Sequence, residues 1–125
     1  MEIQNRFFLR ELSERTFDGK SAEFKKYEML AVDFRKVLAI IAKELFFVRP
    51  KLSITGYIEG YLVYEVNILT KKKELIFLFG EENLPRGYTL KNLFDEICHS
   101  KKNRELLRML PREKSIKSEF EDYYY

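Results

Sequence analysis

A stripe of apolar residues between positions 24 and 48 constrains the fold more than any other feature of the sequence. Its members recur every three or four positions: Phe24, Tyr27, Ala31, Phe34, Leu38, Ile41, Leu45 and Val48. This spacing keeps one face of an α-helix continuously apolar. Pro50 lacks an amide donor and disfavours helical geometry at the residue before it, so it ends the pattern. The sequence therefore predicts one long amphipathic helix over residues 24–48.

A shorter helix is expected before the long one. Residues 2–15 carry two neighbouring apolar stripes with Arg and Glu between them, which is typical of a surface helix. The stretch TFDGKS then interrupts the helical pattern. Gly19 adopts unusual backbone dihedrals readily, and Ser21 is a good cap for a following helix. We therefore expect two N-terminal helices joined by this turn.

Residues 52–79 alternate with a period of two, which predicts three antiparallel strands. Turns are expected at Glu59-Gly60 and at Lys71-Lys72. They place one apolar set on the face that packs against the long helix: Tyr57, Leu62, Tyr64, Val66, Ile68, Leu75, Phe77 and Phe79. The opposite face is more apolar than a solvated sheet face usually is, because it carries Ile54, Ile58, Tyr61, Val63, Ile76 and Leu78. We expect this second face to be covered by helices of the chain, a second copy or a partner.

Two short helices follow the predicted sheet. Thr89 is a good cap for the first of them, and Pro111 closes the second. A chain of 125 residues that is 46% apolar suits one domain with a single core. The sequence predicts an α+β domain over residues 1–117, with two N-terminal helices, a three-stranded antiparallel β-meander and two short C-terminal helices. Residues 118–125 are predicted to form a separate acidic and aromatic tail.

The motifs of catalysis and metal binding are incomplete in this sequence. Glu96 and His99 have the spacing of two metal ligands on a helix, but His99 is the only histidine. The single cysteine, Cys98, is adjacent to His99, so the two side chains point about 100° apart on a helix. Gly19-Lys20-Ser21 imitates the end of a phosphate-binding loop without its first glycine or preceding strand. We therefore expect no catalytic residue, no metal, no cofactor and no enzymatic activity.

The cell compartment follows from cysteine content and hydropathy. A lone cysteine cannot form an internal disulfide, and a secreted domain of this size usually carries several. No apolar run resembles a signal peptide or is long enough to span a bilayer. The sequence therefore favours the cytoplasm, with no membrane partner and no small-molecule substrate inferred.

Basic residues are clustered more strongly than the net charge of +3 indicates. Residues 118–125 hold three acids and no base, whereas residues 101–117 hold seven Lys or Arg against two Glu. The sequence predicts a small binding protein that contacts nucleic acid or a nucleic-acid-bound complex through a basic patch. The predicted nucleic-acid-binding residues are Lys71, Lys72, Lys73, Lys101, Lys102, Arg104 and Arg108. Phosphate contacts need correctly placed charge, and about five of them predict a log–log salt slope near −4.5. The competing interpretation is that these charges serve solubility and protect sheet edges.

A protein–protein interaction module, such as an inhibitor, an adaptor or a homo-oligomer, is the alternative function. Its predicted partner-binding residues are Ile76 and Leu78 on the apolar sheet face and Phe120, Tyr123, Tyr124 and Tyr125 in the tail. Four aromatic residues near a chain end are able to dock on the domain's own basic surface or on another protein. The sequence leaves open the partner and whether a nucleic-acid ligand is DNA or RNA.

Overall fold

The computed structural model of the chain describes residues 3–20 and 23–111. Its main elements are α1 (Ile3–Thr16), β1 (Phe17–Asp18), β2 (Glu23–Phe24), α2 (Ala31–Lys43), β3 (Phe46–Leu52), β4 (Ile58–Asn67), β5 (Lys72–Gly80), α3 (Leu90–Leu93) and α4 (Lys101–Met109). A 3-10 turn, η1 (Glu81–Asn83), follows β5, and a π-helical turn, η2 (Phe94–Cys98), continues α3. The prediction of an α+β chain with a three-stranded antiparallel sheet is confirmed. A second, two-stranded sheet of β1 and β2 was not predicted.

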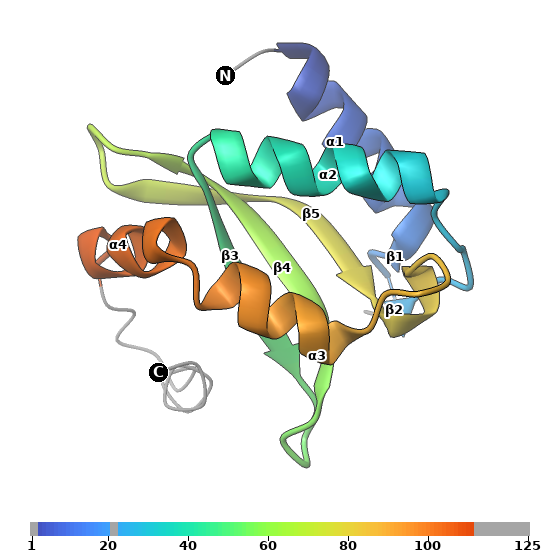
Figure 1. The fold of residues 1–125 in the computed structure, drawn as a ribbon. Helices are drawn as coiled ribbons and strands as arrows, with labels where there is room; N and C mark the ends of the chain where they lie inside the picture. Colours follow the sequence, from blue (N-terminus) through green and yellow to red (C-terminus); the bar gives the residue numbers. More distant parts are fainter. Residues whose placement is uncertain (1–2, 21–22, 112–125) are drawn as a thin grey trace.

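The helices pack around a twisted sheet of order β3-β4-β5. Figure 1 shows α2 crossing the sheet, with α3 and α4 lower in the view than α2. Helix α1 runs beside β5. Aromatic side chains join these layers: Phe34 of α2 packs edge-on against Phe79 at 5.6 Å and against Tyr88 at 4.9 Å between ring centroids. The Tyr61 hydroxyl donates to the Leu90 carbonyl at 2.5 Å. The core therefore lies between the sheet and the helices.

The predicted long helix over residues 24–48 is wrong, because α2 covers only Ala31–Lys43. Asn83 holds the preceding segment extended, since its side-chain amide donates to the carbonyls of Lys25 and Tyr27 at 2.8 Å each. After α2, buried residues 46–48 enter strand β3. Their apolar side chains also suited a helical stripe, so the pattern alone did not separate the two structures. Pro50 lies within β3, an edge strand, where its missing donor is tolerated.

The predicted sheet register is also wrong. Gly60 lies inside β4, opposite Gly80, and the loop between β3 and β4 spans residues 53–57. The turn expected at Lys71-Lys72 would pair Tyr64 with Phe79, but Tyr64 pairs with Leu75. A β-bulge between Val63 and Tyr64 shifts the pairing by one residue, and such a shift exchanges the faces of the strand. As a result, buried side chains come from both of the predicted faces.

Both outer edges of the sheet are covered by side chains of neighbouring helices. On the β5 side, the Thr16 hydroxyl of α1 donates to the Leu78 carbonyl at 2.5 Å. On the β3 side, Asn103 of α4 accepts from the Val48 amide at 2.7 Å and donates to its carbonyl at 2.9 Å. Covered edges disfavour pairing with another chain. The helices therefore close the sheet at these two positions.

The facing glycines Gly60 and Gly80 make room for an aromatic ring. A Cβ on Gly60 would overlap the Phe79 carbonyl oxygen and lie 2.7 Å from the Phe24 ring, and a Cβ on Gly80 would also lie 2.7 Å from that ring. Phe24 of the small β1–β2 sheet thus lies directly on the backbone of the larger sheet. A ring over bare backbone compensates for the side chains that glycine lacks.

Replacing Gly60 by alanine should lower the free energy of unfolding by about 1–3 kcal/mol, because the added methyl group displaces Phe24 or the β5 backbone. Gly19→Ala is the matched control, since an added Cβ there meets no atom within 4 Å. Urea denaturation followed by circular dichroism measures both variants. Equal stability of Gly60→Ala and the wild type would show that the ring does not lie on this glycine.

Candidate nucleic-acid interface

The loop between β4 and β5 presents two of the predicted lysines to solvent. Asn67 builds this loop: its side-chain oxygen accepts from the amides of Leu69 and Thr70 at 3.0 and 3.2 Å, and its carbonyl accepts from the Lys71 amide at 2.8 Å. Lys71 has a φ of 57° in the left-handed region. Lys71 and Lys72 are exposed. We call residues 67–72 the basic hairpin tip.

Lys73, the next residue along β5, lies on the sheet instead of projecting into solvent. Its ammonium group is 4.7 Å from the centre of the Tyr64 ring and 5.8 Å from that of Phe47. A cation at this distance over a ring face is attracted by the ring quadrupole. Lys73 therefore contributes to the sheet surface, and its charge is less accessible than those of Lys71 and Lys72.

Helix α4 presents three other predicted cations on one stripe. The Ser100 hydroxyl caps the helix by accepting from the backbone amide of Asn103 at 3.1 Å. The buried side chains of Asn103 and Leu106 anchor α4 to the core. Positions i, i+3 and i+7 of a helix share a face. On the exposed side these positions are Lys101, Arg104 and Arg108, which we call the basic helix face.

Lys102, also predicted to bind nucleic acid, points the other way and stabilises α2. Its ammonium group donates to the carbonyls of Ile41 and of Glu44, the latter at 2.9 Å. These carbonyls lie at the C-terminal end of α2, where a cation is favourable. Burial lowers the pKa of Lys102, and nearby Glu44 opposes this shift. The structure gives Lys102 a capping role, so we leave it out of the candidate interface.

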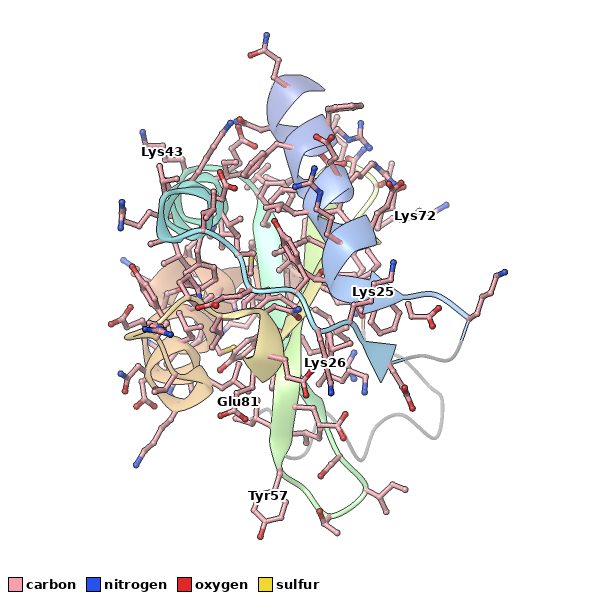
Figure 2. The ribbon with its side chains drawn as sticks, turned by 90° about the vertical axis from the view of Figure 1, so that its right-hand side faces the viewer. Lys25, Lys26, Lys43, Tyr57, Lys72 and Glu81 are labelled. Atoms are coloured by element: carbon pink, nitrogen blue, oxygen red, sulfur yellow. The ribbon has the colours of Figure 1, made fainter. Side chains whose placement is uncertain are left out.

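An open groove of about 1270 Å³ adds one lysine that the sequence did not single out. The groove lies between the end of α2, Arg6 of α1 and the basic hairpin tip. Lys43, the last residue of α2, and Lys72 line it from opposite sides (Figure 2). Lys43 was overlooked because the predicted helix continued past it. The only signal available was its position as a cation near the end of a helical stripe.

Ion pairing distinguishes these cations from three other basic residues. Arg6 and Arg10 pair with Glu74 at 3.3 and 2.8 Å, and Lys51 pairs with Glu59 at 2.7 Å. Within residues 3–20 and 23–111, no carboxylate pairs with the six cations of the candidate interface: Lys43, Lys71, Lys72, Lys101, Arg104 and Arg108. All six are exposed. They therefore keep their charge available to an anionic partner.

The predicted partner-binding residues are not exposed where the structure describes them. Ile76 and Leu78 are buried, at 3% and 9% exposure. Phe120, Tyr123, Tyr124 and Tyr125 lie outside the described residues. Among the residues that the structure describes, the most exposed apolar side chains lie instead in the two loops of the sheet, where Ile54 is fully exposed and Leu69 is 94% exposed.

The remaining chemistry of the described region is limited. Cys98 is a free, buried thiol, and burial raises its pKa to about 12, so it is a poor nucleophile at neutral pH. No group of three His, Cys, Asp or Glu side chains in residues 3–20 and 23–111 is arranged to hold a metal ion. In the same residues, no helix is both long and apolar enough to cross a membrane.

No protein-family model, no curated protein and no solved structure matches the chain. Inferences about its function therefore depend on the placement, exposure and charge of its own side chains.

Proposed function

We propose that this chain is a small, non-enzymatic cytoplasmic protein that binds nucleic acid through the phosphate backbone. The observation that carries the proposal is the set of six exposed cations on α2, the basic hairpin tip and the basic helix face, which pair with no carboxylate of the described residues. Each phosphate contact releases condensed counterions, which favours binding without recognition of base sequence. The cytoplasmic assignment depends on the lone cysteine, Cys98.

The distribution of charge supports this proposal over a general solubility role. Figure 1 shows the basic hairpin tip and α4 at the same end of the molecule. The groove beside the basic hairpin tip is lined by four cations and three carboxylates. The β3–β4 loop lies at the other end of the sheet, and the groove there is lined by four carboxylates, Glu23, Glu59, Glu81 and Glu82, and two lysines. Separation of charge in this way directs a polyanion to one end of the molecule. A surface adapted only for solubility would have both signs interspersed.

Fluorescence anisotropy with a labelled duplex of about 20 base pairs tests the proposal. We expect the full chain to bind at low salt, and Lys72→Gln to weaken binding. Lys51→Gln should leave the affinity unchanged, because Lys51 already pairs with Glu59 at 2.7 Å. An absence of binding to duplex and single-stranded oligonucleotides at low salt would contradict the proposal.

A second candidate function, a protein–protein interaction module, is favoured by the β3–β4 loop. Ile54 is fully exposed there and Tyr57 is 75% exposed, and exposed apolar side chains near acidic groups suit a basic partner surface. Affinity capture from lysate, with and without nuclease, separates the two functions. Partners that survive nuclease but are lost in Ile54→Asp would favour this second candidate.

A further inference from the structure

The basic hairpin tip carries an aliphatic side chain that the described residues leave uncovered. Leu69 is 94% exposed, and its neighbour Ile68 is 42% exposed. The hydrogen bonds that the Asn67 side-chain oxygen accepts from the backbone amides of Leu69 and Thr70 fix the backbone of the loop. Leu69 is therefore held outward, with Lys71 and Lys72 beside it. An apolar tip followed by two cations suits a partner that is anionic outside and apolar inside.

The β3–β4 loop does not combine an exposed aliphatic side chain with positive charge, as the basic hairpin tip does. The β3–β4 loop also has a fully exposed aliphatic residue, Ile54. Its sequence, SITGY over residues 53–57, contains no lysine or arginine. The two loops therefore present similar apolar surface, but only the basic hairpin tip adds positive charge to it. This difference makes Ile54 a natural control for Leu69.

We propose, on the basis of the nucleic-acid-binding function above, that the partner is double-stranded DNA and that the basic hairpin tip enters its minor groove. Lys71 and Lys72 contact phosphates on the groove walls, and Leu69 inserts between base steps. Strands of DNA-binding proteins enter the major or the minor groove, and leucine is among the side chains that wedge between base steps from the minor groove and kink the duplex. RNA helices have a wide, shallow minor groove, so their groove walls do not enclose such a tip.

The available ring contacts favour a duplex over a single strand. Proteins that hold single strands stack the bases on aromatic side chains along a basic groove. Near the basic hairpin tip, the Tyr64 and Phe47 rings lie beneath Lys73. The exposed aromatic residues of the described region, Phe7 and Tyr57, lie on α1 and on the β3–β4 loop. The tip therefore offers the bases an aliphatic wedge in place of a stacking platform.

The test is the bending of a duplex of about 30 base pairs that carries a fluorescent donor and acceptor at its ends. Wild-type protein should raise energy transfer on binding, because a wedge bends the duplex by about 20–90°. Leu69→Ser should bind about tenfold more weakly, without the rise in energy transfer and with the same dependence on salt, because it removes apolar contact but no charge. Ile54→Ser should match the wild type. Both substituted residues are exposed, so the fold is expected to persist.

Other results would overturn the insertion. Equal energy transfer for wild type and Leu69→Ser at saturation would show that Leu69 is not the wedge, although phosphate binding would stand. Tighter binding to a single strand of the same length, or to duplex RNA, would contradict the choice of duplex DNA. Leu69-dependent binding to anionic phospholipid vesicles with no binding to duplex would assign the tip to a lipid surface. If no nucleic acid binds at all, the proposed function fails together with the insertion.

Discussion

Replacing Lys101, Arg104 and Arg108 together by glutamine should weaken duplex binding on the order of a hundredfold at 0.1 M salt. Three phosphate contacts contribute about 2.7 to the log–log salt slope, so their loss has its largest effect at low salt. The substitutions lie on the exposed side of α4, away from buried Asn103 and Leu106, so the fold should persist. Anisotropy titrations over a salt series measure the change.

The matched control for this variant removes the same charge from elements outside the candidate interface. Lys20, Lys26 and Lys91 are exposed, and their replacement by glutamine lowers the net charge by the same amount. This control should bind within about threefold of the wild type, because net charge alone has a weak, screened effect at a distance. Equal loss of affinity in both triple variants would show that binding follows total charge and not the basic helix face.

Asn103→Leu should lower the free energy of unfolding by about 2–5 kcal/mol, because it leaves two buried backbone groups of Val48 without their partner. Asn103 is 1% exposed, and its amide bonds both the N–H and the carbonyl of Val48. Leucine has a similar size, so the loss reports hydrogen bonding more than packing. A typical domain has about 5–15 kcal/mol of stability in total, so the effect should be easily measured.

Urea denaturation measures this loss, and Asn92→Leu is the control. Asn92 is exposed on α3, and its replacement should change stability by no more than about 0.5 kcal/mol. The Val48 amide should also exchange its hydrogen faster in Asn103→Leu. An unchanged denaturation midpoint for Asn103→Leu would contradict the role of this side chain at the β3 edge.

The parts of the fold that depend on local signals were predictable from sequence. α1 and α4 lie close to their predicted positions, and the predicted cap at Thr89 accepts from the Asn92 amide at 3.3 Å. The alternating pattern also indicated an antiparallel sheet. These features follow from hydrophobic period and capping, which involve residues near one another in the chain.

Features that depend on distant residues were not predictable in the same way. Gly60 suits a hairpin turn by residue type, but its role is to lie beneath Phe24. The extended segment before α2 depends on Asn83, more than fifty positions away. Such tertiary contacts override local propensity, and they exclude a seven-turn helix that the apolar spacing alone permits.

The residues of the candidate site were likewise predictable only where their role depends on neighbours in the sequence. Clustering of charge was sufficient to select Lys71, Lys72 and the basic helix face. It did not indicate that Lys102 caps α2 or that Lys73 lies over the Tyr64 ring, because both roles depend on elements far away in sequence. For the same reason, Lys43 becomes a candidate only once α2 is seen to end beside the groove.

The dependence of duplex affinity on salt tests the central claim most directly. If about five phosphates contact the exposed cations, the slope of log K against log salt should be near −4.5 for the wild type. It should fall to about −1.8 when Lys101, Arg104 and Arg108 are replaced by glutamine, since three of those contacts are lost. A flat salt response of the wild type, or the same slope in both proteins, would contradict binding through these cations.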